Sequence, residues 1–346
     1  MKAMALTEFG KDLVDLELED PTPADDEVIL DVTACGICQT DLKIVAGVHS
    51  SSKRVRLPFV PGHEITGVVS SIGRNVKGWN VGDHAVVYFY LTCGTCKFCQ
   101  AGRTQLCSGF KNGSAFTIGF TRNGGYGEKV KVPARNLVKI SPEVPAQEAA
   151  VIPDALSTAV HAVVDTGDVR IGERVLIFGA GGVGLHALQI ARLCGAHTIV
   201  ADISEEKLRL AKQLGAHETL LTNSDDVSGL RVDKIIETSG VLADNMWLMG
   251  VLEAGGTLAV VGNKVGANLS TGVMQLTANE HIIKGSRASG IGHVRTAVDL
   301  VERGLVKPIV GTMYAFTQVN EALADLKSGK INGRGVMCKS LTASSV

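Results

Sequence analysis

Four cysteines lie close together in the segment that runs from Cys93 through Cys96 and Cys99 to Cys107, with the spacing C-x2-C-x2-C-x7-C. Four thiolates at such short spacings can surround a zinc ion tetrahedrally, which leaves no open position for a substrate. The bacterial ferredoxin pattern for an iron–sulfur cluster ends in a shorter spacing and a proline, and both are absent here. The segment predicts a structural zinc site, with unliganded surface cysteines as the alternative.

A glycine-rich turn, GAGGVG at 179–184, follows the apolar run 174–178 and precedes a helical pattern. GxGxxG alone is weak evidence, but between a strand and a helix it fits a dinucleotide site. Gly179 permits the tight turn, Gly181 lets the backbone approach a pyrophosphate, and Gly184 lets the helix pack on the strand. A purely structural glycine turn is the alternative. The predicted cofactor-binding residues of this turn are Gly179, Gly181, Gly182, Val183 and Gly184.

Asp202 closes the next predicted strand, 23 positions after Gly179. An acidic residue there accepts hydrogen bonds from the adenosine ribose and repels a 2′-phosphate, which favours NAD over NADP. Alternatively, Asp202 merely precedes a helix cap at Ser204. Lys207 is included among the cofactor-binding residues, and either Lys207 or Arg209 could neutralise a 2′-phosphate if the loop turned toward it.

Two shorter segments carry residues that can ligate metals: Cys35-Gly36-Ile37-Cys38-Gln39-Thr40-Asp41 and Gly62-His63-Glu64. Alone, each has an ordinary explanation, because a cysteine at a strand end is usually packed in the core and a single histidine is usually structural. Their order in the chain relative to the other motifs is what indicates a metal site.

Taken in order, GICxTD, GHE, the four-cysteine pattern, the acidic residue Asp154 and GxGGVG resemble the zinc-containing medium-chain alcohol dehydrogenases, particularly their bacterial and archaeal NAD-dependent secondary-alcohol members. The resemblance covers essentially the whole chain. It implies a second, catalytic zinc ion held by Cys38 and His63. Where the Cys2His set would have its second cysteine, this chain has Asp154. We favour Asp154 as the direct third ligand; the alternative is Glu64 on zinc, with Asp154 reaching the metal through water.

The resemblance also implies the reaction, which is reversible oxidation of primary or secondary alcohols to aldehydes or ketones with NAD. Zinc with one open position makes the proton of an alcohol more acidic, and a hydride can then pass to nicotinamide. Thr40 resembles the family hydroxyl that takes this proton; capping the following helix is its alternative role. Lys43 replaces a histidine found in many relatives, so Lys43, His49 or solvent could complete the relay. The predicted catalytic residues are Thr40, Cys38, His63 and Asp154.

The same residues are compatible with two other functions. Polyol or sugar dehydrogenation is permitted by the acidic residues Asp154 and Glu64, and a zinc-free, non-catalytic NAD-binding relative is the third hypothesis. A polyol needs polar partners for its hydroxyls, whereas the strand that enters the family pocket is apolar and aromatic. The residues that argue against a polyol are Val87, Phe89, Tyr90, Leu91, Phe116 and Phe120, and the alternative role of the aromatic ones is packing in the core.

Two sequence patterns predict the helices and strands that position these residues. The first part of the chain has short β-rich runs, and from about Gly172 the pattern becomes strand, glycine turn, helix, strand, as in parallel βαβ units. The predicted strands are 27–34, 65–72, 84–91, 174–178, 198–201, 234–237, 257–261, 281–284 and 336–339. The predicted helices are 183–194, 205–214, 297–302 and 320–327.

We therefore predict an α/β fold with a GroES-like β-rich catalytic domain and a Rossmann cofactor domain built on a doubly wound parallel sheet. The catalytic domain is expected at 1–154, the NAD-binding domain at 155–288, and a return segment of the catalytic domain at 289–346. The expected cofactors are NAD and two zinc ions per chain, one catalytic and one structural.

Composition excludes other classes. The 346 residues carry 34 Lys and Arg against 35 Asp and Glu, so no basic field exists to hold nucleic acid or an anionic membrane. The first residues have no signal-peptide pattern, and no segment has the roughly 20 apolar residues that span a bilayer. We expect a cytoplasmic protein whose eight cysteines do not form disulfides. Its expected partners are a small alcohol, aldehyde or ketone and further copies of itself, as a homotetramer or, alternatively, a dimer.

Overall fold

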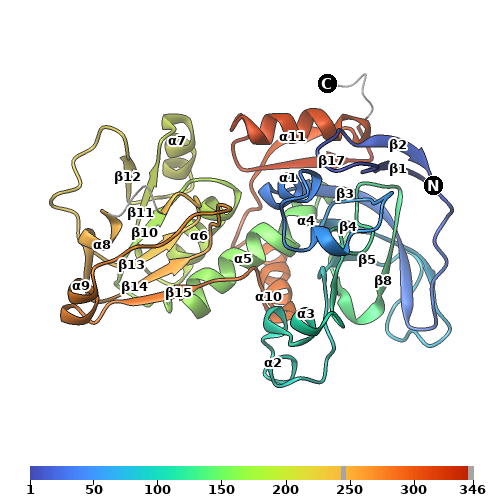
Figure 1. Cartoon of the computed structure of the whole chain (residues 1–346), viewed down its shortest axis with the longest axis horizontal. Coiled ribbons are helices and arrows are strands. Elements are labelled where there is room, and N and C mark those ends of the chain that lie inside the picture. The colour runs from blue at the N-terminus through green and yellow to red at the C-terminus, as the bar shows by residue number, and fades with distance from the viewer. Residues whose placement is uncertain (243–246, 342–346) are drawn as a thin grey trace. The chain divides into compact units, whose positions relative to one another are not determined.

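The computed structural model describes residues 1–242 and 247–341. The chain divides into two compact units, of which one is Met1–Asp154 with Ser289–Val346 and the other is Ala155–Ala288. Residues 342–346, which the sequence assigns to the return segment, lie outside the described residues. Figure 1 shows the elements of both units along the chain.

The second unit contains a parallel sheet with the strand order β12-β11-β10-β13-β14-β15. All five neighbouring pairs are parallel. The chain starts in the middle at β10, extends to one edge, and then returns to build the other half, which is the doubly wound arrangement. The predicted Rossmann sheet is therefore confirmed.

Strands and helices follow one another along this unit (Figure 1), except that the described residues between β12 and β13 contain no helix. Its strands are β10 (Arg174–Phe178), β11 (His197–Asp202), β12 (Glu218–Leu221), β13 (Val232–Glu237), β14 (Leu252–Val260) and β15 (Ile282–Gly285). Its helices are α5 (Ser157–Val160), the π-helical η5 (His161–Thr166), α6 (Gly182–Leu193), α7 (Glu205–Gln213), α8 (Leu248–Val251) and α9 (Val273–Ala278).

Local sequence explains these elements. Strand β10 is an apolar run whose Val175, Leu176 and Ile177 are fully buried, as expected where helices cover both faces of a parallel sheet. Helix α6 packs against β10 and β11, and α7 packs against β11 and β12. Helix α7 begins as predicted, because the Ser204 hydroxyl accepts a hydrogen bond from the Lys207 backbone nitrogen at 3.4 Å.

The first unit is built on a seven-stranded mixed sheet with the order β16-β17-β3-β4-β5-β9, and β8 pairs with β3. Only β16 and β17 are parallel in this sheet. Its strands are β3 (Glu27–Ile37), β4 (Glu64–Ile72), β5 (His84–Val87), β8 (Lys129–Pro133), β9 (Leu137–Lys139), β16 (Val310–Tyr314) and β17 (Arg334–Cys338). The predicted β-rich domain is confirmed in its class.

Smaller elements surround this sheet. Two two-stranded sheets pair β1 (Lys2–Ala5) with β2 (Val14–Glu17) and β6 (Tyr90–Leu91) with β7 (Phe116–Thr117). The helices are α1 (Gln39–Val45), α2 (Lys97–Gln100), α3 (Gly109–Asn112), α4 (Ala146–Val151), the π-helical η4 (Ile152–Leu156), α10 (Ile291–Glu302) and α11 (Val319–Lys327). Short 3₁₀ turns are η1 (Ser52–Arg54), η2 (Thr104–Leu106), η3 (Ala134–Asn136) and η7 (Phe316–Gln318).

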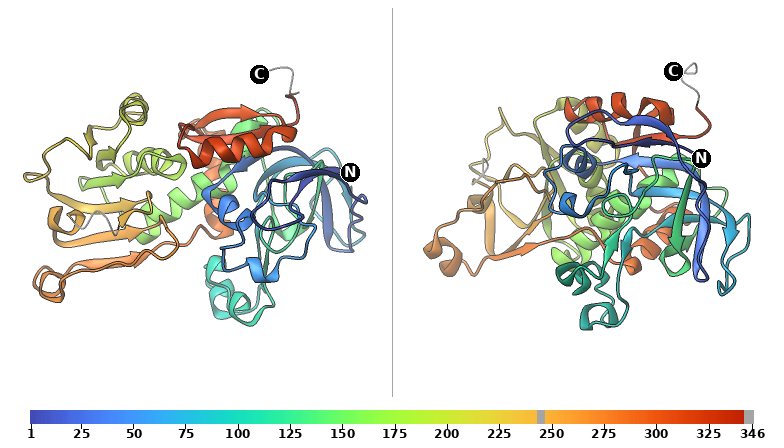
Figure 2. Two further views of the ribbon diagram at one scale, coloured as in Figure 1. Left: turned by 45° about the horizontal axis from the view of Figure 1, so that its top comes forward. Right: turned by 45° about the vertical axis from the view of Figure 1, so that its right-hand side comes forward.

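The C-terminal part of the first unit returns to its N-terminal part. Helix α11 lies beside α1 in both views of Figure 2. The Asn320 side chain accepts a hydrogen bond from the Leu13 backbone nitrogen at 2.9 Å and donates one to the Leu13 carbonyl at 2.8 Å. Strand β17 pairs with β3 from Gly335 opposite Ile37 to Cys338 opposite Ala34. Segments about 300 residues apart thus share one core.

The structure contains elements that the sequence did not predict, among them β1, β2, β8, β9, β12, β16, α1 and α4, and it divides one predicted strand. The predicted strand 84–91 is two strands, β5 and β6, because the chain leaves the ladder at Tyr88. The Asn136 side chain donates hydrogen bonds to the carbonyls of Tyr88 and Tyr90, each at 2.8 Å, and replaces the missing strand partner. Strand β12 was not predicted at all.

Among the described residues, no helix combines the length and the apolar character that crossing a bilayer requires.

Candidate functional site

The four cysteines of the spacing motif converge on one point. Cys93 follows β6, Cys96 precedes α2, Cys99 lies in α2, and Cys107 follows η2. The Sγ–Sγ distances are 3.5 Å for Cys93 and Cys107, 3.6 Å for Cys96 and Cys99, and 3.9 Å for Cys93 and Cys99. A zinc ion with four Zn–S bonds of about 2.3 Å in a tetrahedron requires Sγ–Sγ distances of about 3.8 Å. The cluster has the dimensions of a closed zinc site.

Backbone N–H groups point at these sulfurs. The Cys107 Sγ accepts hydrogen bonds from the backbone nitrogens of Cys93, at 3.4 Å, and Gly109, at 3.3 Å. Hydrogen bonds from the backbone of Ser108 and Cys99 lower the pKa of Cys96 to about 5. Burial and a hydrogen bond with Cys96 raise the pKa of Cys99 to about 12. The backbone thus stabilises thiolate within the cluster, which is the form that binds zinc.

A second cluster of possible ligands contains Cys38, His63, Glu64 and Asp154, whose donor atoms all lie within 4.8 Å of one another. Cys38 precedes α1, Glu64 is the first residue of β4, and Asp154 lies in the π-helical η4. Single π-helical turns are often found at functional sites. Gly36 lies opposite Glu64 in the β3–β4 ladder, where any Cβ would collide with the Glu64 carboxylate. The structure therefore brings together all four predicted catalytic-zinc residues.

Asp41 connects Cys38, which follows β3, with His63, which precedes β4. Its Oδ1 lies 3.2 Å from His63 Nδ1, and its Oδ2 accepts a hydrogen bond from the Cys38 backbone nitrogen at 2.9 Å. His63 Nε2 faces Asp154 Oδ2 at 3.6 Å. Burial lowers the pKa of His63, but the Asp41 carboxylate and hydrogen bonds with Asp154, Asp41 and Cys38 outweigh this effect and raise it well above its usual value. The cluster therefore favours a positive charge, as a cation would supply.

Arg334 joins the two carboxylates that compete for the third ligand position. Its Nε donates to both oxygens of Glu64, at 2.9 and 3.0 Å, and a terminal nitrogen donates to Asp154 Oδ2 at 2.7 Å. Burial raises the pKa of Glu64 to about 8 although Arg334 opposes it. Burial also acts to raise the pKa of Asp154, but His63 and Arg334 hold it well below its usual value. Both carboxylates lie close enough to Cys38 and His63 to bind the same metal ion. Arg334 Nε contacts both oxygens of Glu64, and a terminal nitrogen of Arg334 contacts Asp154 Oδ2.

Both clusters fit zinc by their donor chemistry. The first offers four thiolates, and the second offers a thiolate, an imidazole nitrogen and carboxylate oxygens, all of which bind zinc in proteins. Four protein ligands close the first site. In the second, three ligands and an open position correspond to a catalytic site. The chain thus has a structural four-cysteine zinc site and a catalytic site with cysteine, histidine and carboxylate ligands.

Thr40 lies next to the second cluster. Its hydroxyl is 3.6 Å from Cys38 Sγ, and its backbone nitrogen donates to the same sulfur at 3.5 Å. Helix α1 is capped by the Cys38 side chain, with Asp41 completing the cap, so the alternative role of Thr40 as the cap is wrong. Lys43 lies one turn further along α1, and burial lowers its pKa. His49 Nδ1 accepts a hydrogen bond from the Ser51 backbone nitrogen at 3.1 Å.

Aromatic rings surround His63. The rings of Phe89 and Phe120 both meet the imidazole edge-on, with centroid distances of 5.2 and 4.7 Å. Phe120 also packs with Ile44 in a small buried cluster. Phe116, in contrast, lies against the guanidinium groups of Arg54 and Arg122 and is not part of this wall.

The second unit has the geometry predicted for the glycine turn. Gly179 has a φ of +103°, and a Cβ on Gly184 would collide with the carbonyl oxygen of Gly179. A Cβ on Gly181 would meet no atom within 4 Å, so the backbone there faces open space that a phosphate could approach. Gly182 and Val183 form the first turn of α6, whose N-terminus favours negative charge.

Asp202 is the last residue of β11 and faces the same turn. Its Oδ2 accepts a hydrogen bond from the Ala180 backbone nitrogen at 2.7 Å, and its Oδ1 accepts one from Ser204 at 3.0 Å. Asp202 thus also supports the start of α7, which was its alternative role, and the two roles are compatible. Lys207 lies in the first turn of α7, whereas Arg209 forms an exposed ion pair with Glu205 at 4.0 Å.

Two residues of the catalytic cluster were missed by the sequence analysis. Asp41 belongs to the GICxTD motif, and a carboxylate three residues after Cys38 is a capping pattern that could have predicted its role. Arg334 is 270 residues from Glu64 in sequence and carries no local signal. A charged residue at the start of a strand that is otherwise buried was the only indication.

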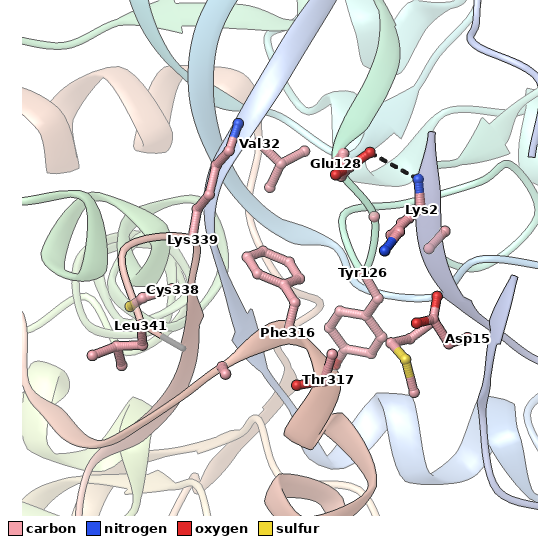
Figure 3. A pocket seen from close by; sticks show the side chains of 14 residues that line it. Lys2, Asp15, Val32, Tyr126, Glu128, Phe316, Thr317, Cys338, Lys339 and Leu341 are labelled. Carbon is pink, nitrogen blue, oxygen red and sulfur yellow. Dashed lines mark hydrogen bonds between the residues drawn. The ribbon is translucent and has the colours of Figure 1, made fainter. Parts of the chain in front are cut away.

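A cavity of about 410 Å³ lies elsewhere in the first unit (Figure 3). The rings of Tyr126 and Phe316 line it, and the Lys2 backbone nitrogen at its rim donates to Glu128 at 2.8 Å. None of its lining residues is a predicted zinc ligand or cofactor-binding residue.

Comparisons with known proteins match both parts of the chain. Residues 24–142 match the alcohol dehydrogenase GroES-like domain, and residues 182–303 match the zinc-binding dehydrogenase domain. An alcohol dehydrogenase of Geobacillus stearothermophilus is 34% identical over 97% of this chain and 98% of its own length. An L-threonine 3-dehydrogenase of Shewanella sp. strain W3-18-1 is 29% identical over 96% of this chain and 98% of its own length.

Solved structures show the same fold. The crystal structure of an NAD-dependent alcohol dehydrogenase superposes with a TM-score of 0.91, at 31% identity, over 98% of this chain and 99% of that one. The match confirms the predicted combination of a GroES-like domain with a Rossmann sheet. The relatives act on different substrates by name, so the likeness alone does not choose among alcohols.

Proposed function

Because the chain belongs to the zinc-containing medium-chain alcohol dehydrogenase family, we propose that it oxidises primary or secondary alcohols reversibly to aldehydes or ketones with NAD. Membership makes it a zinc-dependent dehydrogenase. The observation that carries the proposal is the convergence of Cys38, His63, Glu64 and Asp154 on one point. In this proposal Met1–Asp154 with Ser289–Val346 is the catalytic domain and Ala155–Ala288 is the cofactor domain.

The proposed ligands of the catalytic zinc are Cys38, His63 and Asp154. Arg334 Nε donates to both carboxylate oxygens of Glu64, whereas Asp154 Oδ2 meets this guanidinium and also faces His63 Nε2 at 3.6 Å. Zinc bound here acts as a Lewis acid that makes the hydroxyl proton of an alcohol more acidic. Glu64 on zinc is the competing assignment.

This chain's own residues then serve the reaction in three ways. Asp41 orients His63 through Nδ1, which leaves Nε2 for the metal. The Thr40 hydroxyl, 3.6 Å from Cys38 Sγ, is placed to accept the substrate proton and pass it on. Phe89 and Phe120 exclude water beside His63.

The aromatic wall also favours an apolar alcohol over a polyol or an amino acid. Phe89 and Phe120 have no polar group to offer a substrate, and both are buried beside His63. A polyol or a threonine zwitterion needs hydrogen-bonding or charged partners for its extra groups. Polyol dehydrogenation remains the second candidate, because Asp154 and Glu64 add carboxylates to the site.

NAD is the proposed cofactor, with the glycine turn holding the pyrophosphate and Asp202 the adenosine ribose. Lys207 lies in the first turn of α7, just after Asp202, and Arg209 is paired with Glu205, so Arg209 is a weaker candidate for binding a 2′-phosphate. We also propose a homotetramer in the cytoplasm. A reducing compartment suits eight cysteines that are all free in the structure.

The test is the formation of NADH, followed by its absorbance, with secondary and primary alcohols, sorbitol and L-threonine. We expect turnover with apolar alcohols, loss of turnover after chelation, and none in a His63→Ala variant that still folds. Faster turnover with sorbitol or threonine than with any simple alcohol would contradict the substrate class. Turnover that survives complete removal of zinc would contradict the mechanism.

A further inference from the structure

Glu237 is a fully buried acid in the second unit that the proposed function does not use. It is the last residue of β13 and lies beside Phe178 of β10 and Val260 of β14. The strand order reverses between β10 and β13. In open parallel sheets, ligands bind at the carboxyl ends of the strands at such a reversal. Glu237 therefore lies where this sheet is expected to hold a dinucleotide.

The carboxylate and the backbone carbonyl of Glu237 each accept hydrogen bonds from a different loop. Its Oε1 accepts hydrogen bonds from the Ser239 hydroxyl at 2.5 Å and from the Gly240 backbone nitrogen at 2.8 Å. Its backbone carbonyl accepts hydrogen bonds from Val261 at 2.8 Å and Gly262 at 3.0 Å. Its Oε2 is buried and has no hydrogen-bond partner among the described residues. One residue thus holds the loop after β13 against the loop after β14.

These loops also touch the glycine turn. The Thr238 hydroxyl donates to the Gly179 carbonyl at 2.9 Å, and a Cβ on Gly179 would come within 2.9 Å of the Ser239 backbone nitrogen. A Cβ on Gly262 would collide with the Gly240 backbone nitrogen. Three loops are packed without spare space, so the position of one constrains the others.

The order of the strands indicates which half of the cofactor lies over the loops 238–240 and 261–263. Asp202 ends β11, on one side of β10, and is the proposed partner of the adenosine ribose. A dinucleotide crosses the strand reversal, with one half over each side of it. The other half then lies over the ends of β13 and β14, where the loops 238–240 and 261–263 begin.

We propose that Glu237 is a positioning residue for the nicotinamide half of the cofactor, because its Oε1 fixes the loop of Ser239 and Gly240 against which that half rests. The proposal depends on the proposed use of NAD. Burial raises the pKa of Glu237, although hydrogen bonds from Ser239 and Gly240 oppose this effect. Oε1 remains an acceptor whether or not the carboxyl is protonated, so the amide oxygen of glutamine can replace it.

The test compares two nucleotides by calorimetry: NADH, which contains both halves, and ADP-ribose, which lacks nicotinamide. In Glu237→Ala we expect the Kd for NADH to rise about tenfold, while the Kd for ADP-ribose changes less than about twofold. In Glu237→Gln both values stay within about threefold of wild type, because the acceptor is kept. Thermal unfolding and zinc content serve as controls for folding.

An unchanged Kd for NADH in Glu237→Ala would overturn the proposal, and so would an equal loss for ADP-ribose, which would indicate a merely structural role. If Glu237→Ala does not fold, Ser239→Ala decides, since Ser239 is exposed and its change removes one bond to Oε1. We expect a rise of about threefold for NADH only, and no change would contradict the proposal. Wild-type protein that binds NADH but oxidises no alcohol would defeat the proposed function alone.

Discussion

Arg334 decides between the two carboxylates of the catalytic cluster. Because its Nε engages both oxygens of Glu64, while Asp154 Oδ2 faces His63 Nε2 at 3.6 Å, we predict that Asp154→Ala reduces the zinc content from two ions per chain to one and abolishes turnover. Loss of a direct ligand costs more than the roughly 10- to 100-fold in metal affinity that is typical of an outer partner. Metal analysis of purified protein is the measurement.

Glu64→Gln is the matched control, since it keeps an acceptor for Arg334 and should retain both zinc ions. The opposite result, with zinc kept in Asp154→Ala and lost in Glu64→Ala, would make Glu64 the ligand. It would also favour polyol dehydrogenation over oxidation of a simple alcohol, because the second carboxylate, Asp154, would then face the substrate instead of binding the metal.

At Asp202, the prediction concerns the choice of cofactor. Replacing Asp202 by Gly and Ile203 by Arg should shift the ratio of kcat/KM for NADP over NAD upward by at least about tenfold. The change at Asp202 removes the carboxylate that repels a 2′-phosphate. The change at Ile203 adds a guanidinium that attracts this phosphate, and it should be exposed because Ile203 is 71% exposed. Wild-type enzyme that already uses NADP as well as NAD would contradict the role given to Asp202.

Residues whose partners are near in sequence could be predicted, and those with distant partners could not. The cysteine spacing and the glycine turn are local patterns, and the structure gives both the expected geometry. Asp154 was placed beside Cys38 and His63 by resemblance, not by any local pattern. Arg334 was missed because its bond to Glu64 depends on β17 and β4 entering the same sheet, which only the assembled fold specifies.

Among the elements, the loop with the four cysteines depends most on its metal. It contains only the short helices α2, η2 and α3, which are too short to be stable alone. We predict that Cys99→Ser lowers the melting temperature and releases one zinc ion, because closed zinc sites contribute on the order of 10 kcal/mol to folding in small domains. Differential scanning calorimetry with metal analysis measures both effects.

Cys194→Ser provides the comparison, since Cys194 ends α6 outside both clusters and is half-buried. It should leave the zinc content and the melting temperature unchanged. Equal destabilisation by the two substitutions would show that the loop does not depend on metal.

Element types followed from sequence wherever a clear period or a turn signal was present. Strand β10 and helix α7 have both, and they begin where they were expected. Strand β12 was missed because Glu218 and Thr219 are exposed and only Leu220 is buried, so it has no apolar run. It is a strand because β11 offers it a parallel partner from Ile199 opposite Glu218 onward.

At the scale of the whole molecule, the sheet of the second unit ends in an edge that is poorly protected. Strand β15 pairs with β14 and is the last strand of that sheet among the described residues. Ile282 on this edge is 43% exposed, and Val273 and Met274 of the preceding helix α9 are 76% and 82% exposed. Edge strands with apolar neighbours are sites where another chain can pair.

We therefore predict that β15 and α9 form one of the interfaces of a homotetramer. A tetramer with two-fold axes contains more than one kind of interface, so removal of this one should leave dimers. The double substitution Met274→Lys and Ile282→Lys places charges on the edge, and light scattering should find half the wild-type mass. Ile171→Lys, at a residue that is 87% exposed elsewhere in the same unit, should leave the mass unchanged. A monomeric wild-type protein would contradict the homotetramer. A double variant with the same mass as wild type would show that β15 and α9 do not form the interface.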